Sequence, residues 1–365
     1  DSLTISDSTG ELAKFDSDGS LGERLDLAGK DMAFTLASNV AISGDFWFSV
    51  DNAKLVMAGE HVSANFAAAG VSVGVEDASF GLITSKTGGA AMEASGGFVL
   101  TGSDFAAVSA DYAAVKYNTT NNEFTGYKIG KGEHTYTFGT LGASANLLEL
   151  STSILNLTVA DFFTLSGDFG FKKNGSELNV ISANANVAMG AGEFKIGVSN
   201  AQLGLIVSPS GKALEAKGGV FAQLGSNVEL SAQESEILWK NSATVLTAEN
   251  KTLATAGLTY TFGDEIVASS GIEEVRVSGA VLKAADFFRA GGNFAFHKSS
   301  TTLQPSEGTE IQADLLTIGA SNLDIFAGMN GGTIDAIGLA LSGASFALAL
   351  MSDKEDSSRR WTALK

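Results

Sequence analysis

The chain has 365 residues, of which 44% are hydrophobic, and a formal net charge of −18 from 23 basic and 41 acidic residues. This hydrophobic content supports a buried core and excludes an intrinsically disordered chain. The negative charge argues against nucleic acid as a partner, because it repels phosphates. The sequence contains no run of about 18 apolar residues, so no transmembrane helix is predicted. It contains no cysteine, which excludes disulfides and thiolate metal sites.

Residues 1–30 are predicted to be the end of a preceding repeat unit or a linker with an acidic turn. The turn is "DSDGS" (Asp16–Ser20), which spaces carboxylates two apart before a glycine. Oxygen ligands at this spacing suit a hard cation, so the segment is either a calcium site or a solvated turn. The candidate ligands are Asp16, Asp18, Ser20 and Glu23. No other cofactor is expected.

Residues 31–150 are predicted to form the first repeat unit. Phe46, Phe48 and Val50 alternate in "SGDFWFSV", which is the period of a half-buried β-strand. Two further phrases mark the unit, "VGVEDASFGLI" (Val73–Ile83) and "HTYTFG" (His134–Gly139).

Residues 151–275 are predicted to form the second repeat unit, because the same phrases return after about 124 residues. They are "SGDFGF" (Ser166–Phe171), "IGVSNAQLGLI" (Ile196–Ile206) and "LTYTFG" (Leu258–Gly263). An Asn-Gly pair in Lys172–Glu177 is typical of a hairpin turn. One stretch, Gly142–Phe163, also places leucines at helical spacing, but its Ser, Thr and Asn residues favour a strand.

Residues 276–365 are predicted to form a third, incomplete unit. It has "GGNFAF" (Gly291–Phe296), and its "IGLALSGASFALAL" (Ile337–Leu350) comes about 18 residues late, which indicates an insertion near residues 305–320. The many glycines and few prolines fit short strands joined by turns. The predicted fold is therefore all-β, with tandem units of short antiparallel strands in stacked or continuous curved sheets, elongated, and with the natural chain extending further.

The motif that opens each unit is predicted to be architectural. Its glycine is expected to supply a turn at the start of a strand, the Asp or Asn after it to tolerate left-handed geometry, and the two phenylalanines to fill the core. The motif residues are Gly44, Asp45, Phe46, Phe48, Gly167, Asp168, Phe169, Phe171, Gly292, Asn293, Phe294 and Phe296.

No catalytic residue is predicted. The three histidines, His61, His134 and His297, do not belong to the repeated pattern, and Glu76–Asp77 becomes Ser199–Asn200 in the next unit. A recurrent acid–base pair is therefore not supported. Four N-glycosylation signals are present, at Asn118, Asn156, Asn174 and Asn250.

The repeat of about 124 residues, the recurrent "DASFGLI" and "SGDFxF" phrases, the acidity and the lack of cysteine together resemble the repeat regions of very large bacterial hemagglutinin-like or giant adhesin-type surface proteins. The resemblance implies a structural or adhesive protein at the cell surface or outside the cell, a segment of a fibre, sheath or stalk that self-associates along or between chains and contacts cell surfaces or glycans. Two alternatives stay open, an outer-membrane β-barrel, which alternating apolar residues also fit, and a glycan-binding β-module.

Overall fold

The computed structural model is built almost entirely of antiparallel β-strands. The all-β prediction is confirmed, and the stretch with leucines at helical spacing is a strand as well. Among the described residues no helix is long and apolar enough to cross a membrane. The structure describes residues 2–7, 10–16, 25–36, 40–50, 54–85, 88–102, 105–131, 134–143, 147–159, 163–191, 194–224, 228–255, 257–285, 287–304, 310–356 and 358–365.

The chain divides into two compact units by its internal contacts. Unit 1 comprises Asp1–Leu155, Asp168–Asn179 and Thr255–Gly257, and unit 2 comprises the remainder. Four strands contribute residues to both units. They are β12 (Leu147–Val159), β13 (Phe163–Asn174), β14 (Glu177–Ala191) and β19 (Thr252–Thr255).

Unit 1 contains one sheet in which β3, β4, β5, β6, β7 and β9 pair in that order, followed by the first half of β12. Two hairpins, β1–β2 and β10–β11, pair separately. The strands of this unit are β1 (Ser2–Asp7), β2 (Gly10–Asp16), β3 (Leu25–Leu36), β4 (Val40–Val50), β5 (Lys54–Ala68), β6 (Val71–Ser85), β7 (Ala90–Thr101), β8 (Phe105–Ser109), β9 (Tyr112–Asn118), β10 (Lys128–Lys131) and β11 (His134–Thr137).

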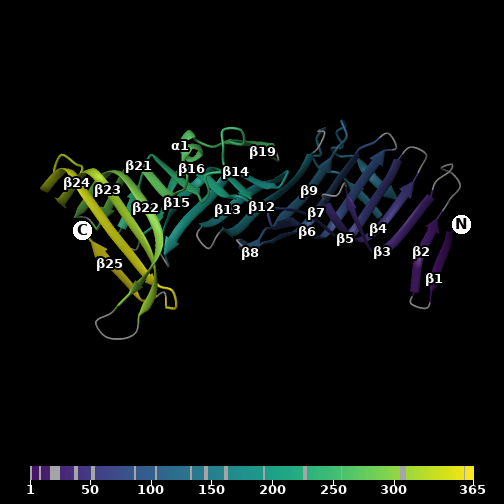
Figure 1. Ribbon diagram of the computed structural model, residues 1–365, viewed down its shortest axis with the longest axis horizontal. Coiled ribbons are helices and arrows are strands. Elements are labelled where there is room, and N and C mark those ends of the chain that lie inside the picture. The colour runs from purple at the N-terminus through teal and green to yellow at the C-terminus, as the bar shows by residue number, and fades with distance from the viewer. Residues whose placement is uncertain are drawn as a thin grey trace. The chain divides into compact units, whose positions relative to one another are not determined.

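Unit 2 contains a sheet in which β15, β16, β18, β21, β22, β23, β24 and β25 pair in that order. A hairpin of β19 and β20 and the short helix α1 interrupt the chain between β18 and β21 (Figure 1). The elements are β15 (Phe194–Ser208), β16 (Gly211–Gln223), β17 (Val228–Ser231), β18 (Glu234–Lys240), β19 (Thr252–Thr255), β20 (Leu258–Thr261), α1 (Asp264–Ala268), β21 (Ile272–Ala284), β22 (Phe288–Leu303), β23 (Ile311–Met329), β24 (Ile337–Asp353) and β25 (Arg360–Leu364).

The repeat in the sequence is a repeat of strands. Strands β4 to β7 recur as β13 to β16 and again as β22 to β25, while β9, β10, β11 and β12 recur as β18, β19, β20 and β21. We refer to these three recurrences as the first, second and third copies. The predicted boundaries at residues 30/31, 150/151 and 275/276 fall inside strands β3, β12 and β21. A periodic sheet has no preferred point at which one copy begins.

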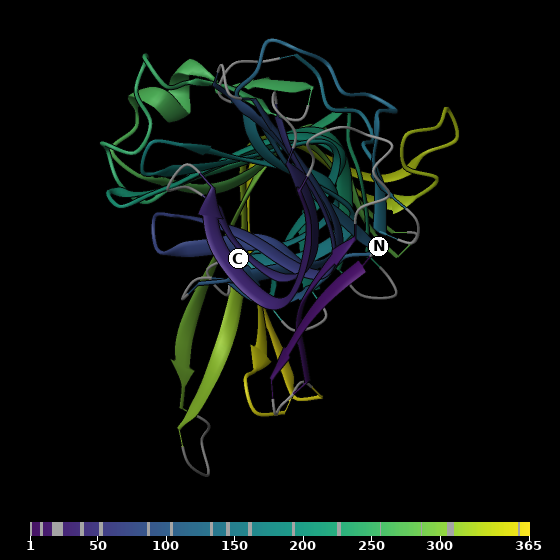
Figure 2. The same cartoon turned by 90° about the vertical axis from the view of Figure 1, so that its right-hand side faces the viewer.

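Bulges interrupt the pairing near the middle of most long strands. They fall, for example, between Gly29 and Met32, Gly59 and Val62, and Glu76 and Ser79. A bulge inserts an extra residue into one strand and increases its bend and twist. Accordingly the purple and blue strands of unit 1 are strongly curved when seen end-on (Figure 2).

The extra residues of the third copy lengthen a hairpin. Strand β22 has 16 residues and β23 has 19, whereas β13 and β14 have 12 and 15. The predicted insertion near residues 305–320 therefore lies in the connection between β22 and β23 and in the arms beside it.

Candidate functional site

The opening motif lies inside a strand in all three copies. Gly44, Gly167 and Gly292 are interior residues of β4, β13 and β22, with φ angles of 153°, 140° and 153°. The prediction that they form a turn at a strand start is therefore wrong. The following Asp45, Asp168 and Asn293 do not have a positive φ either. The side chain of each serves instead as a hydrogen-bond acceptor.

That acceptor holds a bulge in the preceding strand. The side-chain oxygen of Asp45 accepts the backbone N–H of Asp31 at 3.0 Å, and Asp168 accepts that of Ile154 at 3.0 Å. In the third copy Asn293 accepts the N–H of Gly279 at 3.1 Å. The donors have φ angles of 51°, 50° and 58°, so the left-handed residue lies 14 positions before the motif residue. We call this pair the bulge clamp.

The first phenylalanine of each motif is buried: Phe46, Phe169 and Phe294 are 3%, 2% and 3% exposed. The ring of Phe46 lies 5.3 Å from that of Phe80, which belongs to the "SFGLI" phrase. The second phenylalanine differs between copies, because Phe171 and Phe296 are buried whereas Phe48 is only half-buried.

The phrase "TYTFG" belongs to a flap that covers one face of the sheet. The first flap, residues 119–143, carries β10–β11, and the second flap, residues 241–271, carries β19, β20 and α1. The first flap packs Ile129, Tyr136 and Phe138 on the sheet, and the second packs Leu253, Tyr260 and Phe262. The face that a flap covers is called the flap face below.

Each flap tyrosine lies directly on a glycine of the flap face. A Cβ atom at Gly81 would lie 2.3 Å from Cδ1 of Tyr136, and one at Gly204 would lie 2.3 Å from Cδ1 of Tyr260. Burial raises the pKa of both phenols above the ordinary value, and the neighbouring Glu93 and Glu215 carboxylates raise it further. The glycines of "FGLI" and "LGLI" therefore make room for the tyrosines of "TYTFG".

The glycine of "TYTFG" binds a buried carboxylate. In the first flap the N–H of Gly139 donates to the Glu93 carboxylate at 2.6 Å. In the second flap the N–H of Gly263 donates to the Glu215 carboxylate at 2.8 Å. Both carboxylates are almost fully buried, at 3% and 1% exposed. A buried carboxylate requires a compensating cation or hydrogen bonds.

The compensating cation comes from a different strand in each copy. Lys116 of β9 approaches Glu93 to 4.0 Å, whereas Lys217, on the same strand as Glu215, approaches it to 2.8 Å. Lys217 also pairs with Glu236 at 3.1 Å. The glutamate occupies the same position in both copies, whereas the lysine does not. These charges therefore anchor the flap rather than form a recurrent acid–base pair.

A second anchor holds each flap at the end of β9 or β18. The buried Asn118 donates its amide hydrogens to the backbone oxygens of Asn122 and Gly142. Its counterpart Lys240 is 2% exposed and points Nζ at four carbonyl oxygens, of Leu246, Ile266, Val267 and Ser269, at 2.9–3.2 Å. Burial lowers the pKa of Lys240. The glycosylation signal at Asn118 is thus buried in the folded chain.

The flap face of the third copy is open to solvent. In the third copy Ala347 lies opposite Lys365, as Gly81 lies opposite Glu93 in the first copy. Likewise Ala349 lies opposite Ala363, as Ile83 lies opposite Ala91. The four positions are buried in the first and second copies, whereas Ala347, Ala363 and Lys365 are exposed and Ala349 is half-buried.

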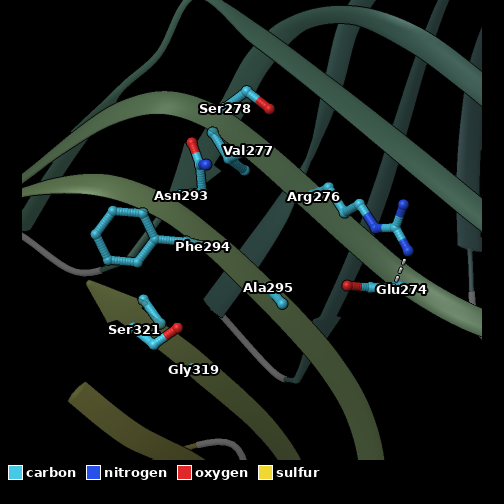
Figure 3. Close-up of a pocket in the computed structure, with 10 residues that line it drawn as sticks. Glu274, Arg276, Val277, Ser278, Asn293, Phe294, Ala295, Gly319 and Ser321 are labelled. Carbon is cyan, nitrogen blue, oxygen red and sulfur yellow. Dashed lines mark hydrogen bonds and ion pairs between the residues drawn. The ribbon is translucent and has the colours of Figure 1, made fainter. Parts of the chain in front are cut away.

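A shallow pocket of about 440 Å³ lies on the same sheet, over β21, β22 and β23. Ala295, Gly319 and Arg276 are among the residues that line it, and the Arg276 guanidinium donates a hydrogen bond to Glu274 (Figure 3). Ala295 and Gly319 of the third copy are paired with each other, and they occupy the positions of Trp47 and Ala58 in the first copy. Trp47 and Ala58 pack under the first flap. Gly319 in turn pairs with Ala347, so the pocket adjoins the exposed positions of the third copy, and we take this face as the candidate functional site.

The other predicted site residues are the candidate calcium ligands. Asp18, Ser20 and Glu23 lie outside the described residues, and so does the side chain of Asp16. Among described residues no group of three or more His, Asp or Glu could hold a metal ion.

The three histidines are all exposed, and His61 pairs with Asp77 at 2.6 Å across two bulges. The second copy has Asn184 and Asn200 at these positions, so this pair does not recur.

The contact between each flap and the sheet has a counterpart in the sequence. "TYTFG" and "GLI" recur together in the first and second copies. A joint recurrence of this kind is expected of two segments that are in contact. In comparisons with known proteins, no family model, no curated protein and no solved structure matches this chain.

Proposed function

We propose that this chain is a structural, non-catalytic segment of an extracellular or cell-surface β-repeat array, of the kind that forms a fibre, sheath or adhesive stalk. The observation that carries the proposal is that the contacts of the repeated residues are structural. The bulge clamps, the tyrosine on glycine and the glycine bound to a buried glutamate all serve backbone geometry or packing.

Repeat proteins gain stability from intrinsic terms and from the contacts between neighbouring repeats, so copies can be added without a new core design. Strands continue from one copy to the next in this chain, and the flap of each of the first two copies packs back on that copy's strands. An array built this way suits a load-bearing or spacing role. The acidity supports solubility of a surface rich in β-strands.

Two measurements test the proposal. A chain in which residues 151–274 are duplicated is expected to fold with the same circular dichroism per residue and to increase the maximum dimension in small-angle scattering by a fixed step per inserted period. A duplication that aggregates or unfolds would contradict the array.

The cellular role is tested separately with antibodies raised against the chain. They are expected to label intact cells of the producing organism in immunogold electron microscopy, and mild shearing is expected to release the labelled material. Label that requires permeabilised cells would contradict a surface role.

A further inference from the structure

We propose that a second pocket, on β21, β22 and β23, binds a small amphipathic anion, an aromatic or alkyl group that carries a carboxylate. The pocket lies between the turn that joins β21 to β22 and the turn that joins β23 to β24, and its volume is about 460 Å³. Pockets for small molecules usually enclose about 300–1,000 Å³. The inference goes beyond the proposed array, which does not depend on it.

The turn that forms one wall of the pocket is particular to the third copy. Residues 330–336 join β23 to β24, whereas residues 69–70 and 192–193 make the corresponding connections in the first and second copies. The backbone N–H and the hydroxyl of Thr333 both donate to the carbonyl oxygen of Asn330, at 3.1 and 2.9 Å. The N–H of Gly328 donates to the carbonyl oxygen of Phe287 at 2.8 Å, which ties β23 to the other turn. Hydrogen bonds therefore fix both walls.

Two glycines of this turn lie directly on side chains of the pocket. A Cβ at Gly331 would lie 2.5 Å from Cδ1 of Phe326, and a Cβ at Gly332 would overlap Nη1 of Arg289. Gly332 also has a φ of 89°, which favours glycine. The lack of side chains at these positions leaves room for the Phe326 ring and the Arg289 guanidinium in the pocket wall.

The charge of the pocket is positive. Lys283 and Arg289 lie opposite each other in β21 and β22, and no acidic residue is among the described residues that line the pocket. Within the described part of the chain neither cation forms an ion pair, although Arg276 and Arg359 both pair with carboxylates. The whole chain has 41 acidic and 23 basic residues. An arginine without an acidic partner in such a chain is suited to bind a carboxylate from outside, because its guanidinium can donate two parallel hydrogen bonds.

The apolar part of the ligand is inferred from the rim of the pocket. Phe287 and Met329 are 62% and 54% exposed, and the Phe326 ring between the cations and the turn is half-buried. A ligand whose ring or chain covers these side chains removes apolar surface from water. Apolar contact at the rim and a carboxylate at Arg289 together define an amphipathic anion.

The exposure of this site does not depend on a flap. Arg289 lies three residues before Gly292, and Ala41 and Thr164 lie three residues before Gly44 and Gly167 in the other copies. Ala41 and Thr164 are exposed although their copies carry a flap. The described residues that line the pocket belong to β21, β22, β23 and the two turns, and none belongs to β24 or β25. The pocket is therefore a property of these strands and turns.

The experiment uses the full chain with phenylbutyrate as the probe and follows the amide NMR signals of Gly331 and Gly332. We expect both signals to shift in a saturable way. Phenylbutylamine has the same ring and chain with a positive charge, and butyrate has the carboxylate without the ring. Both controls are expected to bind about tenfold more weakly or less. Equal binding of the amine, or shifts that leave Gly331 and Gly332 unchanged, would overturn the proposal.

Variants test the two parts of the site separately. Arg289→Gln is expected to weaken phenylbutyrate binding about tenfold, because the charged hydrogen bonds are lost, and Arg289→Lys is expected to weaken it less. Phe287→Ser, at an exposed residue that the fold does not require, is expected to weaken binding of the ring without changing the melting temperature. Lys298→Gln removes a positive charge at a distant part of β22 and is the matched control. A loss in Lys298→Gln equal to that in Arg289→Gln would overturn the proposal.

An anionic membrane surface offers the same combination of apolar groups and negative charge. Vesicles of equal parts phosphatidylcholine and phosphatidylglycerol are therefore mixed with the chain and sedimented. We expect no binding to them, because the net charge of −18 repels an anionic surface. Co-sedimentation that Arg289→Gln abolishes would assign the pocket to lipid and overturn a free acid as its ligand.

Discussion

The side chain of Asp168 accepts the backbone N–H of Ile154 at 3.0 Å, and this bond holds a left-handed bulge in the neighbouring strand. Asp45 and Asn293 do the same in the other copies. Acceptor oxygen, rather than charge, is therefore the shared requirement.

Asp168→Ala is expected to lower the free energy of unfolding by about 1 kcal/mol, because the bulge loses its hydrogen bond. Asp168→Asn is expected to be nearly silent, since the amide oxygen can accept the same N–H. Urea denaturation followed by circular dichroism measures both. Equal losses in the two variants would show that charge matters and would contradict the clamp.

Ile154→Gly is expected to stabilise the chain by about 1 kcal/mol. Ile154 is β-branched and has a φ of 50°, so its backbone is strained in left-handed geometry. Its side chain is 60% exposed, so burial of that side chain offsets little of the strain. The third copy has Gly279 there, with its N–H bonded in the same way. Ser153→Gly, which has no such strain to relieve, is the control and is expected to lose about 0.5–1 kcal/mol. A destabilised Ile154→Gly would contradict the interpretation.

Gly204→Ala is expected to cost about 1–3 kcal/mol, because the new methyl group would lie 2.3 Å from the ring of Tyr260 and displace the second flap. Gly319→Ala is the matched control, since a Cβ there meets nothing within 4 Å. Hydrogen exchange at the Gly263 amide, which donates to Glu215, is expected to accelerate in Gly204→Ala only. Unchanged protection there would show that the ring does not rest on the glycine.

Phe169→Ala is expected to cost about 3–5 kcal/mol, the usual range for a buried phenylalanine, since Phe169 is 2% exposed. Phe221→Ala, at a residue that is 38% exposed, is the control and is expected to lose much less. Chemical denaturation compares the two. Similar losses would mean that burial at Phe169 does not support the core.

The pair of His61 and Asp77 is expected to make the imidazole titrate above 6.5, because the Asp77 carboxylate accepts its hydrogen bond and raises its pKa. A raised pKa in the folded state means that the pair's stabilisation is complete below pH 6.5 and is lost as pH rises through the folded-state pKa. NMR titration of the imidazole measures this. In Asp77→Asn the His61 pKa is expected to fall, and an unchanged value would contradict the pairing.

The all-β fold and the period of about 124 residues follow from the order of residues along the chain. Apolar residues at every second position permit only strands with one buried face, and a recurrence of about 124 residues requires the same strands to return. The burial of Phe46, Phe169 and Phe294 follows from the same alternation. These properties depend on spacing along the chain.

The role of each repeated residue depends on which strands pair. The partner of Asp168 is 14 residues away in another strand, and that of Tyr260 is a glycine in β15. A bulge shifts the register by a residue, so which residues meet across strands cannot be counted from the motif alone. Only the strand pairing shows that Lys365 and Ala347 correspond to Glu93 and Gly81, because it places the members of each pair opposite each other.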